Sequence, residues 1–127
     1  MYDKITYKQT KPKVFYDTLR LLRKLNTANK NINKFERATI LEPYILNRLS
    51  KALDNTAKIN IAKSLTQIEI IQLMEEIITD IDTAREIFLF FTQNSDIKYG
   101  INFIYETNID FENIVKQLNG WKKSKIS

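Results

Sequence analysis

Lysine and arginine side chains recur in the first half of this chain at spacings that place them on one side of a helix. Lys13, Arg20 and Lys24 lie seven and four residues apart, with Arg23 beside them. Positions at these separations share a helix face, and a row of cations at this pitch is suited to follow nucleic-acid phosphates. Because no aromatic side chains alternate with the row, we expect little sequence preference and a strong dependence on salt. The set predicted to contact nucleic acid is Lys13, Arg20, Arg23, Lys24, Lys34, Arg37, Lys122, Lys123 and Lys125.

Charge is divided into blocks along the chain. Residues 1–63 carry 14 Lys and Arg against 5 Asp and Glu, residues 64–115 carry 2 against 10, and the last twelve residues add four lysines. A basic block of this size attracts polyanions. An acidic block in the same chain can instead pair with it inside the fold, so two interpretations stay open. The acidic residues available for such pairing are Glu69, Glu75, Glu76, Asp80, Asp82 and Glu86.

The residue types that the chain lacks exclude most catalytic and metal-binding sites. With no cysteine and no histidine, it has no thiolate ligand, no imidazole base and no Ser-His or Cys-His pair. Glu76, Asp80 and Asp82 are interpreted as a solvated acidic face, because a di-iron bundle requires Glu-x-x-His motifs. Arg85 stands among these acids and is predicted either to form ion pairs with them or to lie in an interface. We expect a non-catalytic protein without a cofactor or a metal.

The scarcity of turn residues indicates an all-α domain. Two glycines and two prolines in 127 residues are too few for the frequent turns of an all-β or βαβ fold. Four amphipathic segments predict an up-down-up-down four-helix bundle that forms one domain over residues 1–127. No signal peptide and no membrane-spanning stretch is present, so a cytoplasmic protein is expected. The helices are expected at about 10–25, 33–56, 64–93 and 97–121, between an arm at 1–10 and a basic tail at 122–127.

Proline and capping signals predict where these helices begin and bend. Pro12 is tolerated in the first turn of a helix that begins near Thr10. Residues 33–36 (Asn-Lys-Phe-Glu) and 64–67 (Ser-Leu-Thr-Gln) match the capping-box pattern, in which the first and fourth residues bond each other's backbone amides. Pro43 lies inside the second segment, and the apolar periodicity continues past it. We therefore predict a bend at Pro43 and not a helix end.

The third segment carries more apolar residues than a surface helix needs. They form two adjacent stripes, one beginning at Ile68 and the other at Ile70. A face of this width favours burial against a second chain, so we predict a homo-oligomer. The predicted interface residues are Ile70, Leu73, Ile77, Ile87 and Trp121.

Four features in this order resemble a known family. They are residues 15–19 (Phe-Tyr-Asp-Thr-Leu), residues 34–37 (Lys-Phe-Glu-Arg), the long aliphatic third helix and residues 118–124 (Leu-Asn-Gly-Trp-Lys-Lys-Ser). Together they resemble the small four-helix-bundle proteins that include the accessory variability determinant (Avd) of diversity-generating retroelements. The same superfamily includes proteins encoded by intervening sequences in 23S rRNA genes. The resemblance covers residues 14–124, and the Gly-Trp pair followed by basic residues is its most specific part.

The resemblance, and not composition or spacing, implies a particular function. It implies a basic homopentameric barrel that binds its cognate reverse transcriptase and RNA or DNA, and that supports mutagenic cDNA synthesis without activity of its own. The alternative is a structural or interaction protein of the rRNA intervening-sequence type with no retroelement role. A small phage or plasmid protein that blocks a host nucleic-acid enzyme is a third possibility. Fold alone does not choose among them.

Overall fold

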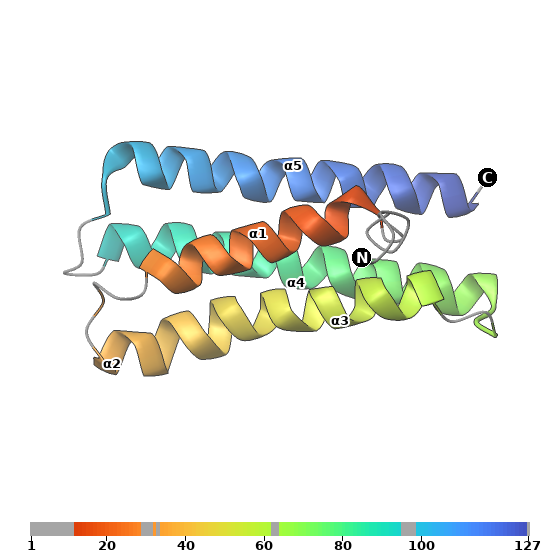
Figure 1. The fold of residues 1–127 in the computed structure, drawn as a ribbon, viewed down its shortest axis with the longest axis horizontal. Helices are drawn as coiled ribbons and strands as arrows, with labels where there is room; N and C mark the ends of the chain where they lie inside the picture. The colour runs from red at the N-terminus through yellow and green to blue at the C-terminus, as the bar shows by residue number, and fades with distance from the viewer. Residues whose placement is uncertain (1–11, 29–31, 33, 62–63, 95–98, 127) are drawn as a thin grey trace, which may run out of the picture.

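Four helical rods make up the chain in the computed structural model, which describes residues 12–28, 32, 34–61, 64–94 and 99–126. Of these residues 93% are helical and none is in a strand. Successive rods run in opposite directions and pack side by side (Figure 1), which confirms the predicted all-α bundle. The elements are α1 (Lys13–Ala28), α2 (Lys34–Glu36), η3 (Arg37–Leu46), α3 (Asn47–Ile61), α4 (Gln67–Asn94) and α5 (Ile101–Ile126). The predicted arm, the start near Thr10 and the cap at Asn33 lie outside the described residues.

α1 begins directly after Pro12. Pro12 has no amide hydrogen to lose, and its carbonyl oxygen accepts from the Phe15 amide at 3.0 Å, so the proline suits a helix start. The buried residues Val14, Thr18, Leu21 and Leu25 follow one another at three- and four-residue spacing, which is one helix face. The opposite face therefore points its charged side chains to solvent.

The second rod is continuous through Pro43, as the periodicity predicted. α2, η3 and α3 follow one another without a break, and the residues flanking η3, Glu36 and Asn47, have right-handed helical dihedral angles. The segment around Pro43 is π-helical. In a regular α-helix the proline ring clashes with the carbonyl group four residues earlier, here that of Thr39. The wider π turn relieves that clash while Leu41 and Ile45 stay buried.

The capping box at the start of α4 involves different residues from those predicted. The Glu69 amide donates to Thr66 Oγ1 at 3.1 Å, and the Thr66 amide donates to Glu69 Oε1 at 2.9 Å. The cap is therefore Thr66 with Glu69, two residues later than the predicted pair of Ser64 and Gln67. A carboxylate accepts more strongly than an amide oxygen, which favours the later pair. The hydrogen bond from the Thr66 backbone, followed by that from its side chain, lowers the pKa of Glu69.

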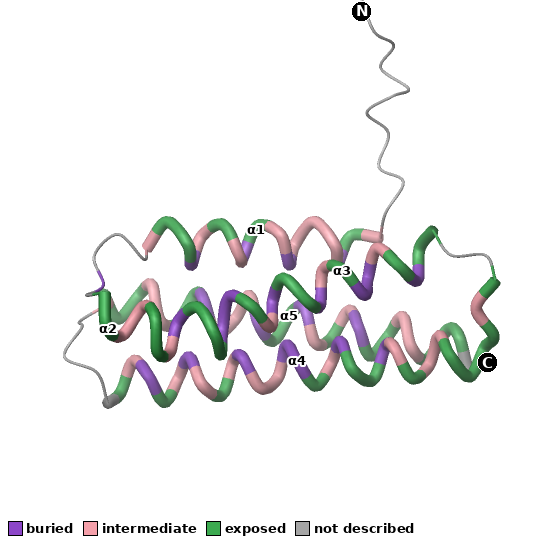
Figure 2. The backbone as a smooth tube through the Cα atoms, turned by 90° about the horizontal axis from the view of Figure 1, so that it is seen from below, coloured by how far each residue is buried: buried purple, intermediate pink, exposed green. Residues whose placement is uncertain are grey.

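α4 lies at the centre of the packing, and this position accounts for its wide apolar face. Its contacts with α3 and α5 are the most extensive in the bundle, and it also contacts η3. The fully buried residues come from both predicted stripes and form one face that points inward (Figure 2), whereas Ile68, at the start of the first stripe, is 69% exposed. The width of this face is used within one chain. The buried residues are Met74, Ile77, Ile81, Ala84, Phe88 and Phe91.

α5 differs from its prediction at both ends. It continues to Ile126, five residues beyond the predicted end at Trp121, so Lys122, Lys123 and Lys125 lie on a helix and not in a free tail. At the other end it begins at Ile101 and not at the predicted residue 97, and Ile101 is 85% exposed. The chain around Gly120 is ordinary helix, and a Cβ atom there would meet nothing within 4 Å. Within the described residues that glycine serves no close approach.

No helix in the described ranges is both long and apolar enough to cross a membrane.

Candidate functional site

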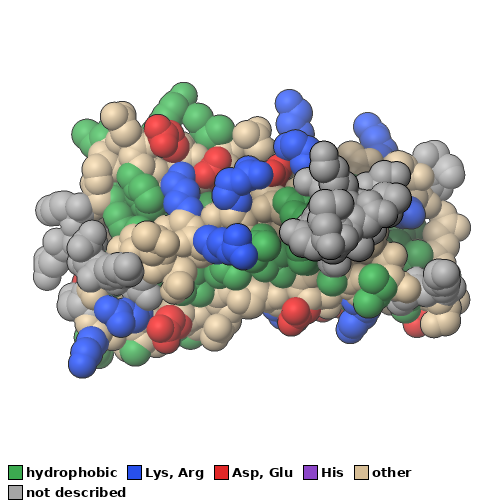
Figure 3. All heavy atoms as spheres, in the orientation of Figure 1, with side chains coloured by type: hydrophobic (Ala, Val, Ile, Leu, Met, Phe, Trp, Pro, Cys, Tyr) green, Lys and Arg blue, Asp and Glu red, His purple; other side chains and the backbone are tan. Residues whose placement is uncertain are grey.

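A groove between the first and last helices collects the largest group of predicted binding residues. It has a volume of about 490 Å³, and Leu21 of α1 and Ile114 of α5, both buried, lie between the two helices. Figure 3 shows Lys and Arg side chains gathered over the middle of the face that α1 and α5 form. We call the groove between these two helices the α1/α5 groove. Its lining residues are Lys13, Asp17, Arg20, Leu21, Lys24, Asp110, Asn113, Ile114, Lys116 and Gln117.

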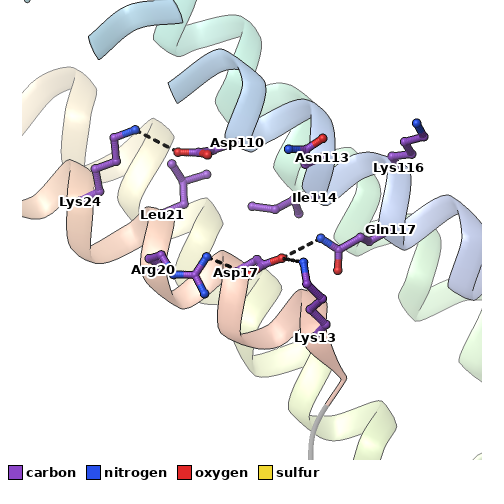
Figure 4. A pocket seen from close by; sticks show the side chains of 10 residues that line it. All are labelled: Lys13, Asp17, Arg20, Leu21, Lys24, Asp110, Asn113, Ile114, Lys116 and Gln117. Atoms are coloured by element: carbon purple, nitrogen blue, oxygen red, sulfur yellow. Dashed lines mark hydrogen bonds and ion pairs between the residues drawn. The ribbon is translucent and has the colours of Figure 1, made fainter. Parts of the chain in front are cut away.

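Two carboxylates lie among the cations of the α1/α5 groove (Figure 4). Asp17 accepts from Lys13 Nζ at 2.8 Å and from Gln117 Nε2 at 2.7 Å, and Arg20 Nη1 lies 3.0 Å from its other oxygen. Lys24 Nζ donates to Asp110 Oδ2 at 2.9 Å. These contacts join α1 to α5 as well as neutralising charge.

The electrostatics of the groove keep Asp17 ionised. Burial raises the pKa of Asp17, but hydrogen bonds from Lys13 and Gln117 and the charges of Lys13 and Arg20 outweigh it, so the pKa lies below its ordinary value. With four cations and two carboxylates lining it, the groove has a net positive charge. It is therefore suited to an anionic ligand.

A shallower hollow continues the groove along α1. It has a volume of about 480 Å³ and shares Arg20 and Lys24 with the α1/α5 groove. It adds Arg23, which is exposed and has no acidic partner among the described residues, and Phe103. Lys24 Nζ lies 5.1 Å from the centre of the Phe103 ring, within cation–π range. Four predicted binding residues thus share one continuous surface.

Aromatic rings pack behind this hollow. Phe103 stacks on Tyr99 with ring centres 5.0 Å apart and an interplanar angle of 24°. Burial, and secondarily the charge of Glu36, raises the pKa of Tyr99 to about 12. The Tyr99 hydroxyl is buried and has no hydrogen-bond partner in the described part of the chain. Tyr99 is therefore a neutral packing residue and not a base at ordinary pH.

The other predicted binding residues lie elsewhere. Lys34 and Arg37 are at the start of the second rod, and Arg37 Nη2 donates to the Ile32 carbonyl oxygen at 3.3 Å, which directs it into the fold. Lys122 lies 3.2 Å from Glu75 of α4. Lys123 and Lys125 are exposed on the last turns of α5. These five residues do not line the α1/α5 groove.

The acidic residues of α4 do pair with some of the basic ones. Arg48 of α3 lies 3.2 Å from Asp80, whose other carboxylate oxygen is buried without a partner among the described residues. Arg85, as predicted, forms ion pairs with acids around it, with N–O distances of 3.7–3.9 Å. No group of three Asp or Glu in the described ranges has the arrangement of a metal site.

The predicted interface residues are largely covered within one chain. Ile77 is 1% exposed, and Ile70, Leu73, Ile87 and Trp121 are partly buried and pack against the core. Their pattern does not require a second chain, because α3 and α5 already flank α4.

The α5 side of the groove was missed from the sequence. In the sequence Lys116 belongs only to the basic last twelve residues, and nothing there marks it as a binding residue. Asp110, Asn113 and Gln117 lie at spacings of three and four, so a polar stripe beside the core face of this helix is the available signal.

No protein-family model, no curated protein and no solved structure matches the chain. The resemblance to the Avd superfamily therefore rests on the sequence features alone.

Proposed function

We propose that this protein is a nucleic-acid-binding accessory protein that holds the phosphate backbone of RNA or DNA along the α1/α5 groove. The observation that carries the proposal is the convergence of Lys13, Arg20, Lys24 and Lys116 from two helices on one groove, with Arg23 on its extension. Rows of cations bind phosphates without reading bases. Catalysis is not part of the proposal.

The resemblance adds a partner to this proposal. By its likeness to Avd, the protein binds a reverse transcriptase and supports mutagenic cDNA synthesis as a homo-oligomer, for which the resemblance implies five subunits. A reverse transcriptase gene with template and variable repeats beside this one supports that role, and an rRNA locus supports the intervening-sequence alternative. Light scattering that reports a monomer of 15.0 kDa at micromolar concentration contradicts the oligomer.

One observation favours a protein-interaction role as the second candidate. Ile101 and Tyr105, one turn apart on α5, are 85% and 66% exposed. Exposed large apolar side chains at helical spacing are typical of protein contacts. If the protein has this role, the ion pairs of the basic residues 1–63 only stabilise the fold.

The binding test measures the fluorescence anisotropy of labelled 20-nucleotide RNA and DNA as salt rises. Each phosphate contact contributes about 0.7 to 0.9 to the logarithmic salt slope. Four contacts therefore predict an affinity loss of roughly 50- to 150-fold between about 50 and 200 mM salt. Absence of binding at 50 mM salt contradicts the proposal and favours the protein-interaction role.

The variant that locates the site is Arg23→Gln with Lys116→Gln. Neither cation has an acidic partner among the described residues, so their removal leaves Asp17 and Asp110 paired. The double variant is expected to lower the salt slope by about 1.4 to 1.8. The matched control is Lys51→Gln with Lys58→Gln, which removes two exposed charges from α3. Equal effects of the two double variants indicate attraction by net charge and not binding in the groove.

A further inference from the structure

Asp17 is the residue of the α1/α5 groove with the most polar contacts. Two cations and one amide converge on its carboxylate at 2.7–3.0 Å, from α1 and from α5. The Asp17 side chain is 13% exposed, whereas those of Lys13 and Arg20 are 76% and 75% exposed. The carboxylate is thus held in place while its cationic partners remain accessible from solvent.

This donor arrangement is one that a phosphate group also satisfies. Lysine ammonium, arginine guanidinium and an amide N–H are the ordinary ligands of phosphate oxygens. In this structure the Asp17 carboxylate occupies them (Figure 4). A phosphate that is to contact Lys13 and Arg20 fully must displace a carboxylate of the same chain.

We propose that Asp17 is an internal counter-anion that selects polynucleotides against single nucleotides and free phosphate. This inference rests on the proposed function of the groove. Asp17 is fixed beside its donors by the fold, so it competes with a high effective concentration. A single phosphate gains too little from Lys13 and Arg20 to displace it. A polynucleotide reaches Lys116 and Arg23 with its other phosphates, and those contacts offset the displacement.

Gln117 strengthens this selection. Its amide donates to the same Asp17 oxygen as Lys13 does and anchors the carboxylate to α5. Removing this hydrogen bond without changing any charge is expected to make it easier for a phosphate to displace the Asp17 carboxylate. The role of Asp17 is therefore separable from its contribution to net charge.

The test compares Asp17→Asn with Asp54→Asn. Both variants remove one negative charge, and Asp54 is exposed on α3, outside the groove. Asparagine keeps the shape of Asp17 and an oxygen that accepts from Gln117. The probes are a labelled 20-nucleotide single strand and inorganic phosphate as a competitor. Asp17→Asn is expected to raise the affinity for the strand about tenfold at 50 mM salt, because no carboxylate then competes with phosphate for Lys13 and Arg20.

The competition with phosphate is the more specific readout. Millimolar phosphate is expected to displace the strand from Asp17→Asn and not from the wild-type protein or from Asp54→Asn. Gln117→Leu provides a second variant of unchanged charge, with an expected gain in affinity of about two- to threefold. Circular dichroism establishes that each variant keeps the helical content of the wild type.

The outcomes separate the two proposals. If the wild-type protein binds and Asp17→Asn binds no more tightly than Asp54→Asn, the counter-anion role is wrong, and Asp17 instead orients Lys13 and Arg20 for binding. If neither the wild type nor any variant binds the strand at 50 mM salt, the proposed function itself is wrong.

Discussion

The two sides of α5 carry opposite versions of one electrostatic arrangement. On the α1 side the Asp17 carboxylate lies among cations, and on the α4 side the Arg85 guanidinium lies among carboxylates. The contacts of Asp17 are 2.7–3.0 Å long. Arg85 has one short hydrogen bond, to Asn108 at 3.0 Å, while its acidic neighbours lie at 3.7–3.9 Å. The Asp17 carboxylate is therefore held by short hydrogen bonds and ion pairs, whereas Arg85 interacts with its acidic neighbours over longer distances.

The difference indicates which charged side chains the protein can lose with little effect on the groove. The acids around Arg85 are about half or more exposed and exchange readily with water and salt. The cations around Asp17 share one fixed carboxylate, so removing that carboxylate changes what the groove can bind. Opposite charges close together thus form weak, solvated ion pairs on one side of α5, and on the other side they line the groove in which we propose that a nucleic acid binds.

The largest expected effect comes from removing a buried side chain of α5, the helix that lies between the regions around Asp17 and Arg85. Phe111 is fully buried on α5, with its ring centre 6.0 Å from that of Phe88. Phe111→Ala removes a large apolar side chain from the core, which costs about 3–5 kcal/mol in the free energy of unfolding. Urea denaturation followed by circular dichroism measures it. Phe35→Ala is the control, because Phe35 is 74% exposed and is expected to change stability by less than about 0.5 kcal/mol. A similar small change in Phe111→Ala contradicts the assigned core.

A smaller effect is expected at Arg85. Arg85→Gln leaves the surrounding acids without their cation, but its ion pairs are long and partly solvated. We expect a loss of about 0.5–1 kcal/mol at low salt that disappears near 0.5 M salt. Thermal unfolding at the two salt concentrations provides the measurement, with Lys51→Gln as the control for loss of an exposed cation. A salt-independent loss shows that the hydrogen bond to Asn108 dominates instead.

Acid titration provides the smallest and most selective comparison. The folded-state pKa of Asp17 lies below its ordinary value, so its ionised form is favoured by folding. That stability is present above the ordinary pKa of 3.8 and is lost as the pH falls through the lower folded value. The difference in unfolding free energy between wild type and Asp17→Asn should therefore shrink on acidification below about pH 4. A difference that stays constant with pH contradicts the role of Lys13 and Arg20 in holding the carboxylate.

The sequence predicted the helices well because their signals are local. The periodicity of α1 and the absence of Gly and Pro in α4 are read from neighbouring residues. The cap of α4 was predicted two residues too early, because Ser64 and Thr66 both match the capping-box pattern. Only the carboxylate of Glu69, three residues after Thr66, distinguishes the two. The continuation through Pro43 was predicted but its π-helical form was not, because a bend and a π turn are both ways to accommodate a proline inside a helix.

The sequence predicted the α1 side of the candidate site but not its α5 side. Helical spacing placed the cations of α1 on one side, yet nothing in that spacing shows which helix faces them. Gln117 and Asp110 lie 100 and 86 residues from their partners on α1, and such pairings depend on how the bundle closes. The apolar width of α4 predicts burial but not the covering partner, and within the chain α3 and α5 cover much of this face; a homo-oligomer stays a prediction.

The separation of α1 and α5 in the chain has a consequence for how the protein acquires its groove. The contacts of α4 with α3 and with α5 join neighbouring segments, and contacts that close short loops form early in folding. The contacts between α1 and α5 span almost the whole chain and carry the largest loop-closure entropy. We therefore expect the groove to form last, after α5 leaves the ribosome and docks. A newly made chain would thus have the cations of α1 well before it has the groove in which we propose that a nucleic acid binds.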